Sequence, residues 1–152
     1  MMGDVLAEEI VEAFPVVNIN SPALDAVRLL IDHRLNGIVV VTETSEMPYA
    51  VLPASQVVRF IVPSYVLEDP ALASVFTESM ADHAVEKLSG KTIRDMLPKQ
   101  PQRVPVVEAD HTLIEVAEVM ARMRSPLVTV VQGRKLQGVI TASRLLAAAL
   151  KE

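Results

Sequence analysis

Pro15-Val16-Val17 opens a stretch of sequence that returns in the second half of the chain as Pro105-Val106-Val107. Further matched positions lie the same 90 residues apart: Arg34 and Arg124, and Val40-Val41 and Val130-Val131. The matching order of apolar and polar positions extends well beyond these identities. A tandem repeat of this size is typical of two half-domains that share one core and have equivalent clefts between them.

The spacing of the repeat then shortens to 88 residues, because Val51…Ala54-Ser55 returns as Val139…Ala142-Ser143. A change of two residues between two apolar runs belongs in a hairpin loop. We therefore expect a longer connector at residues 42–48 in the first copy and a tight turn at residues 132–135 in the second.

Each copy shows the same order of elements. A β-branched run after proline predicts a strand, and a helix with one apolar face follows. Ser21 is expected to cap the first of these helices, and both helices are expected to end near Arg34 and Arg124. Two apolar strands and a short helix complete each copy: Ile38–Val41, Tyr49–Leu52 and Ala54–Ile61, then Leu127–Val131, Leu136–Ile140 and Ala142–Leu150. The pattern predicts a mixed α/β (α+β) fold of two strand-helix-strand-strand-helix motifs packed pseudo-symmetrically.

The predicted division of the chain is a first motif at residues 1–62, a helical insert at 63–90 and a second motif at 91–152. In the insert, Glu68-Asp69-Pro70 indicates a helix start and Ser89-Gly90 its end. Apolar residues recur every four positions between them: Leu72, Phe76, Met80, Ala84 and Leu88. Such a charged amphipathic segment packs as a lid or dimer contact, or else offers a partner its exposed acids, such as Glu78 and Asp82.

Composition excludes several classes of protein. The chain has 152 residues, is 51% apolar and contains no cysteine, so it has neither a disulfide framework nor a thiolate site. The absence of cysteine and of a signal-peptide pattern at the start predicts a cytoplasmic protein. Prolines in the apolar stretch 47–67 argue against membrane insertion. Only five aromatic residues occur, without a basic-aromatic cluster, which argues against nucleic-acid binding.

Charge is distributed unevenly along the chain. Residues 1–62 carry eight acids and three bases, whereas residues 91–152 carry six acids and ten bases. Opposite potentials of this kind attract, either within one chain or between chains packed head to tail.

Motifs for catalysis are missing. His33, His83 and His111 do not lie at metal-binding spacings, which predicts solvated histidines and no metal site. Ser55 and Ser143 have no histidine placed to activate them. We expect no catalytic residues and no enzyme activity.

The repeat order resembles the CBS domain family, as do the lead-in Lys91-Thr92-Ile93-Arg94-Asp95-Met96-Leu97 and the strand end Gly138-Val139-Ile140-Thr141. Chains similar to this one are bacterial stand-alone tandem CBS proteins, also called Bateman modules. The resemblance implies a regulatory module, commonly a homodimer of four motifs. The resemblance further implies that no cofactor is required and that the clefts can bind adenosine-containing regulatory ligands such as AMP, ADP, ATP or S-adenosylmethionine. Each cleft combines the strand-to-helix turn of one motif with the segment before the second strand of the other.

In the family the turn ends in an aspartate that holds ribose, and here Arg144 and Gln56 replace it. The first candidate cleft places the hydroxyl groups of Thr141 and Ser143 at a helix start, which attracts anions, and Arg144 adds a permanent charge. Its opposite wall is expected from Leu35-Asn36-Gly37-Ile38, closed by Val17-Asn18. Alternatively, Thr141 only caps the helix and Arg144 pairs with an acidic neighbour.

The second candidate cleft offers Pro53, Ser55 and Gln56 opposite Ser125-Pro126-Leu127-Val128. It carries no formal charge and is expected to be structural, although Gln56 can hydrogen-bond a ribose or an adenine edge.

Two functional hypotheses follow. The first is a sensor of an anionic, adenine-containing ligand that changes dimer geometry and so modulates a partner, by resemblance a transporter or metabolic enzyme. The second is a CBS dimer that has lost nucleotide binding and docks on a partner through residues 63–90.

Overall fold

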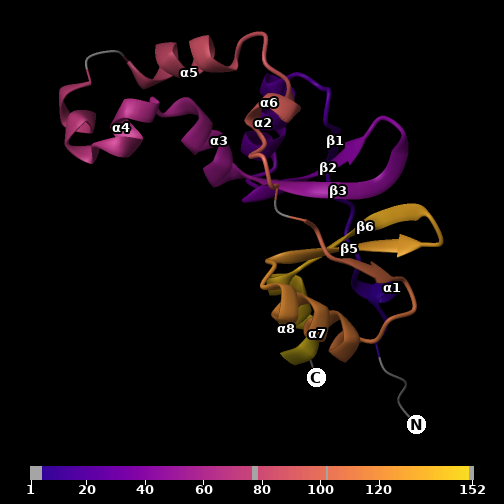
Figure 1. Cartoon of the computed structure of the whole chain (residues 1–152). Helices are drawn as coiled ribbons and strands as arrows, with labels where there is room; N and C mark the ends of the chain where they lie inside the picture. Colours follow the sequence, from indigo (N-terminus) through magenta and orange to yellow (C-terminus); the bar gives the residue numbers. More distant parts are fainter. Residues whose placement is uncertain (1–4, 77–78, 102, 151–152) are drawn as a thin grey trace.

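The computed structural model describes residues 5–76, 79–101 and 103–150 and contains two three-stranded sheets, each covered by helices (Figure 1). The first repeat comprises β1 (Val16–Asn18), α2 (Ala23–Asp32), β2 (Gly37–Thr42), β3 (Ser45–Pro53) and α3 (Ala54–Ile61). The second comprises β4 (Val106–Glu108), α7 (Leu113–Met123), β5 (Leu127–Gln132), β6 (Lys135–Thr141) and α8 (Ala142–Leu150). The predicted order of elements and the mixed α/β class are confirmed.

The strands pair in the same way in both repeats. β1 runs parallel to β2 and β3 antiparallel to it, and β4, β5 and β6 repeat this arrangement. The hairpin turns are equally tight, because Thr42 faces Ser45 and Gln132 faces Lys135. The expected longer connector is therefore wrong. The two additional residues, 46–47, lie within β3 as a bulge, which absorbs them without changing the pairing closer to the core.

Both long helices end where the sequence predicts. Arg34 and Arg124 adopt left-handed conformations, with φ of 52° and 51°. A left-handed residue ends a helix by turning the chain away from its axis. The same backbone device therefore leads from α2 into β2 and from α7 into β5.

The starts of these helices differ. The Thr112 hydroxyl accepts the N–H of Glu115, and the Glu115 carboxylate accepts the N–H of Thr112 at 3.0 Å. This backbone hydrogen bond lowers the pKa of Glu115. The expected cap by Ser21 is wrong, because α2 has no side-chain cap and the N–H of Ala23 donates to the carbonyl of Lys91 at 2.8 Å.

Short lead-in helices cross between the repeats. α1 (Ala7–Ile10) precedes the first repeat in the sequence, yet Ala7 and Ile10 are buried in the core of the second. α6 (Ile93–Met96) precedes the second repeat, yet Ile93 and Met96 are buried in the core of the first. Separation of the two repeats would expose these side chains, so each core depends on a segment from the other half. The division of the sequence at residues 62 and 90 stays a prediction.

A third apolar cluster joins the two sheets. It consists of buried side chains from both, with Phe14 packed against them: Val39, Val51, Val104, Leu127 and Val139. Full burial of a valine or leucine side chain contributes about 1.5–3 kcal/mol. This cluster therefore holds the repeats face to face.

The insert differs from the single helix predicted for residues 70–88. It forms α4 (Ser64–Glu68), a 3-10 helix η1 (Pro70–Val75) and α5 (Met80–Leu88), and Figure 1 shows α4 and α5 projecting away from the sheets. The segment is divided because Asp69 caps η1 and Ser79 caps α5. Of the two acids expected to be exposed, Asp82 is exposed and Glu78 lies outside the described residues.

The base of the insert packs into the core of the first repeat, whereas its tip buries no residue. Leu88 of α5 is buried in the first core, and Lys87 lies 5.1 Å from the ring centroid of Phe60. His83 Nε2 lies 2.8 Å from the carbonyl oxygen of Ile61. No residue of α4 or η1 is buried.

Candidate functional site

The turn from β6 into α8 presents two hydroxyl groups. Thr141 Oγ1 lies 3.2 Å from Ser143 Oγ and accepts the backbone N–H of Arg144 at 3.2 Å. The expectation that Thr141 caps this helix is therefore confirmed. Within the pair, one hydroxyl proton is used by the neighbouring oxygen and the other remains available to an acceptor.

The loop between α2 and β2 forms the opposite wall. The left-handed conformation of Arg34 starts the turn, and the carbonyl of Asn36 accepts the N–H of Ala54 at 2.8 Å. A Cβ added at Gly37 would lie 3.2 Å from Cγ1 of Val51, so the close approach of β3 favours glycine there. These contacts hold the loop against the start of α3.

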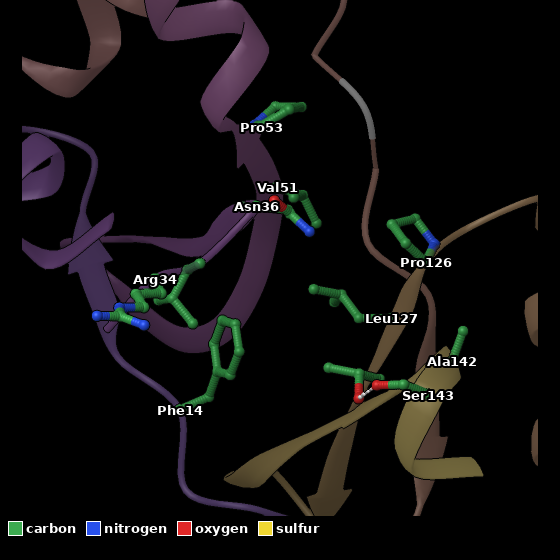
Figure 2. Close-up of a pocket in the computed structure, with 12 residues that line it drawn as sticks. Phe14, Arg34, Asn36, Val51, Pro53, Pro126, Leu127, Ala142 and Ser143 are labelled. Carbon is green, nitrogen blue, oxygen red and sulfur yellow. Dashed lines mark hydrogen bonds between the residues drawn. The ribbon is translucent and has the colours of Figure 1, made fainter. Parts of the chain in front are cut away.

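A cavity of about 390 Å³ lies between the two walls (Figure 2). Its lining comes from both repeats: Phe14, Arg34, Leu35, Asn36, Gly37, Val51, Pro53, Pro126, Leu127, Thr141, Ala142 and Ser143. Its volume is within the range of about 300–1,000 Å³ typical of small-molecule sites. The structure thus brings Thr141 and Ser143 together with Leu35 and Asn36, as the sequence predicts.

Four other residues expected in this cleft do not line the cavity. Val17 and Ile38 are buried in the core of the first repeat, because alternate side chains of a strand face opposite sides of the sheet. Asn18 accepts the N–H of Asn20 with its side-chain oxygen. Arg144 donates its Nε hydrogen to the carbonyl of Ile10 at 3.1 Å, so it binds a backbone oxygen where an acidic side chain was expected.

Of the residues expected in the second cleft, Ser55, Gln56, Ser125 and Val128 lie outside this cavity, whereas Pro53, Pro126 and Leu127 line it. Gln56 donates its amide to the carbonyl of Met96 at 3.0 Å. The Ser125 hydroxyl is buried and donates to the carbonyl of Leu127, Val128 is buried in the second core, and Ser55 is exposed. The cavity therefore takes lining residues from both predicted clefts.

Sequence reasoning missed several residues of the cavity, among them Arg34 and Phe14. Arg34 and Phe14 both line it, and Figure 2 shows the aromatic ring of Phe14 on the wall opposite Leu127. Arg34 directly precedes the predicted wall at Leu35-Asn36 and is repeated as Arg124, which is a signal that could have revealed it. Phe14 lies in the connection from α1 to β1, and only the crossing of α1 onto the second repeat brings it to this place.

The three histidines lie in different surroundings. Within residues 5–76, 79–101 and 103–150, no group of three or more potential ligands could hold a metal ion. His33 is exposed, as predicted, whereas His83 contacts Ile61 and Phe76. Nδ1 of His111 is buried and has no hydrogen-bond partner among the described residues. The prediction of solvated histidines therefore holds for only one of the three.

The comparisons with known proteins agree with this architecture. The sequence model of the CBS domain matches residues 93–151. The crystal structure of a CBS domain-containing protein of unknown function from Kribbella flavida DSM 17836 is 52% identical, with a TM-score of 0.92. The similarity covers 97% of this chain and 99% of that one. The chain belongs to the CBS domain family.

Two more distant CBS structures share the fold. The CBS domain of a CBS domain-containing membrane protein from Sphaerobacter thermophilus is 20% identical, with a TM-score of 0.71 over 98% of this chain and 90% of that one. CBSX2, in complex with AMP, is 17% identical, with a TM-score of 0.64 over 95% of this chain and 96% of that one. No curated protein matches the sequence. In the part of the chain that the structure describes, no helix is both long enough and apolar enough to cross a membrane.

Proposed function

We propose that this CBS pair is a regulatory module that senses an adenine nucleotide, of which AMP is the simplest, in the cavity between its repeats. The observation that carries the proposal is one cavity of about 390 Å³ that joins a hydroxyl pair to an arginine and an asparagine from the opposite repeat. A CBS protein of the same fold is known in complex with AMP, which supports the ligand class.

Each polar group has a chemical role in this proposal. The hydroxyl pair of Thr141 and Ser143, at the positive end of the α8 dipole, offers an O–H donor to a phosphate group. Arg34 supplies the positive charge and Asn36 offers both a donor and an acceptor to a base or ribose. The ring of Phe14 offers a stacking surface.

The absence of a carboxylate at positions 56 and 144 makes the ribose contact different from that expected for the family. Gln56 and Arg144 are already bonded to the carbonyls of Met96 and Ile10. We propose that specificity for the nucleotide comes from the phosphate and base contacts at Thr141, Ser143, Arg34 and Asn36.

Ligand binding would act by stabilising one arrangement of the two repeats. Because the cavity walls come from different repeats, a bound nucleotide contacts both and favours the arrangement in which both walls are in reach. We propose that a cytoplasmic homodimer transmits this preference to a target protein, a transporter or a metabolic enzyme. The coupling cannot exceed the difference in ligand affinity between the arrangements.

The test is calorimetric titration of the full chain with AMP, ADP, ATP and S-adenosylmethionine. We expect saturable binding of AMP to one site per chain. Arg34→Gln should weaken it about tenfold or more, as expected for a hydrogen bond to a charged group, worth about 1.5–3 kcal/mol.

Arg124→Gln is the matched control, since Arg124 has the same left-handed backbone but does not line the cavity. It should leave the affinity unchanged. Equal affinities in both variants, or no binding of any of the four ligands to the parent chain, would contradict the proposal.

The insert favours a second candidate function, docking on a partner. Helices as short as α4 and η1 are marginal in water, and neither buries a residue. Tyr65, Leu67 and Val75 on this tip are 51%, 42% and 66% exposed. We propose a Tyr65→Ser/Val75→Ser variant, which should fold normally yet lose a partner that the parent chain retains. The control is Leu88→Ala, at the buried base of the insert. If this variant lost the partner and the tip variant retained it, docking through the tip would be contradicted.

A further inference from the structure

The segment before β1 lies across the second repeat as a strap, defined here as residues 5–14. Backbone hydrogen bonds fasten it at several points. The N–H of Ala7 donates to the carbonyl of His111 at 2.7 Å, and the N–H of Glu8 donates to the carbonyl of Ala109 at 2.9 Å. Ala7 and Ile10 are buried below it. The strap is thus an integral part of the surface of the second repeat.

Farther along, the strap pairs with the sheet. Glu12 and Val139 exchange two backbone hydrogen bonds, of 2.9 and 3.0 Å. The strap passes so close to β6 that a Cβ added to Gly138 would overlap the carbonyl oxygen of Glu12. Gly138 has a φ of 154°, which also favours glycine. Glycine at this position therefore allows the strap to lie against the strand.

The end of the strap forms part of the cavity. Phe14 lines the cavity and packs against the cluster that joins the two sheets. Only one residue separates it from Glu12, which is paired with β6. If the strap leaves β6, Phe14 must therefore leave the wall of the cavity.

Arg144 connects the strap to the opposite side of the same cavity. Its Nε donates to the carbonyl of Ile10 at 3.1 Å, in a partly buried position. The preceding residues of the same helical turn, Ala142 and Ser143, line the cavity. A single turn of α8 thus holds the strap through one residue and faces the cavity through two others.

The first repeat has the same bond, but its described residues show no equivalent backbone pairing with the third strand. Gln56, at the position equivalent to Arg144, donates to the carbonyl of Met96 in α6. Ala50 replaces Gly138, and the described part of the segment after α6 makes no backbone pair with β3. In both repeats the bond therefore holds a lead-in helix. Only in the second repeat does it also hold a segment that reaches the cavity.

We propose that the strap gates the cavity and that Arg144 is the latch that keeps it closed. Arg144 is then a positioning residue, which acts through Ile10 and Phe14 and need not touch a ligand. The inference rests on the proposed function only for the identity of the ligand that enters the cavity. The tests of the gate itself use no ligand.

Two measurements on the full chain test the gate. The first is amide hydrogen exchange in the parent chain, Arg144→Ala, Arg144→Lys and Gln56→Ala. Without the latch, the amides of Ala7, Glu8 and Glu12 should exchange about tenfold faster or more, since a charge-assisted hydrogen bond is lost. Arg144→Lys should restore part of the protection. Gln56→Ala should accelerate exchange in α6 and leave the strap unchanged.

The second measurement is the rate at which a thiol reagent reaches the cavity. The chain has no cysteine, so Val51→Cys, at a buried position on the cavity wall, provides a single reporter. Its labelling should be about tenfold faster when combined with Arg144→Ala and unchanged when combined with Gln56→Ala. Leu127→Cys reports from the other wall if the first variant does not fold.

Equal strap exchange in Arg144→Ala and the parent chain would overturn the latch. Faster strap exchange with unchanged labelling of both cysteines would overturn the gate. Failure of nucleotides to bind in calorimetry would bear on the proposed function alone, because neither of these measurements contains a nucleotide.

Discussion

The two repeats of this CBS protein share a backbone but differ in the chemistry at equivalent turns. In the second repeat the turn after the third strand presents Thr141 and Ser143 to the cavity. In the first repeat the same turn presents Pro53, which has neither a hydroxyl group nor an N–H. The difference shows that a repeated fold need not provide two equivalent sites. One turn can supply polar groups while its counterpart supplies an apolar wall.

A second difference concerns what lies over the third strand. β6 is paired with the strap at Gly138-Val139, whereas β3 carries Ala50 at the equivalent position and has no such partner among the described residues. The strap therefore makes the second repeat dependent on residues at the start of the sequence.

The largest expected effect is that of Gly138→Ala. The added Cβ would overlap the Glu12 carbonyl and the residue would be strained at its φ of 154°. We expect a loss of about 4 kcal/mol or more in the free energy of unfolding, measured with urea. The reverse change in the first repeat, Ala50→Gly, should cost only about 1 kcal/mol. Equal costs would mean that the strap does not distinguish the repeats.

Truncation of equivalent core residues should have the next largest effect. Leu52 in β3 and Ile140 in β6 are both completely buried. Leu52→Ala and Ile140→Ala should each cost about 2–5 kcal/mol. Because each core contains a lead-in helix from the other half, both variants should still unfold in a single transition. Circular dichroism and differential scanning calorimetry would measure this.

Two separate transitions in either variant would show that the repeats are independent. That outcome would contradict the dependence inferred from the crossing of α1 and α6.

The smallest effect is a pH dependence at the start of α7. The N–H of Thr112 holds the pKa of Glu115 below its ordinary value of 4.5. Since the unfolded chain binds this proton more readily, the contribution to stability is present above about pH 4.5 and decreases as the pH falls through the lowered pKa. Glu115→Gln should remove this part of the pH dependence in melting curves between pH 3 and about 7.

Asp25→Asn is the control for this prediction. Asp25 holds the equivalent place in α2, but the residue at the N-cap is Pro22, which has no N–H to donate. This variant should leave the decrease of the melting temperature at acid pH unchanged. A similar change in both variants would assign the effect to the overall charge and not to the cap.

The sequence was a good guide to the repeated elements and a partial guide to the cavity. It correctly placed Thr141 and Ser143 opposite Leu35 and Asn36, because the turns on which they lie are local features with recognisable residues. It placed Ile38 and Val17 on the wrong side of the sheet, since an apolar run buried on both faces does not show which side chains face which layer. It also treated residues 70–88 as one helix. The apolar residues recur every four positions throughout this segment, and that pattern does not show that Asp69 and Ser79 cap two separate helices.

By itself, the sequence determined the tandem repeat, the order of strands and helices, and the ends of α2 and α7 near Arg34 and Arg124. These features follow from hydrophobic period and turn chemistry, which act between residues close in the chain. Only the tertiary structure decided that α1 and α6 exchange repeats, that Phe14 and Arg34 reach the cavity, and that Arg144 binds Ile10. Those contacts join residues as far apart as positions 10 and 144. They depend on which apolar surfaces can be buried together, and a pattern within either repeat does not specify this choice.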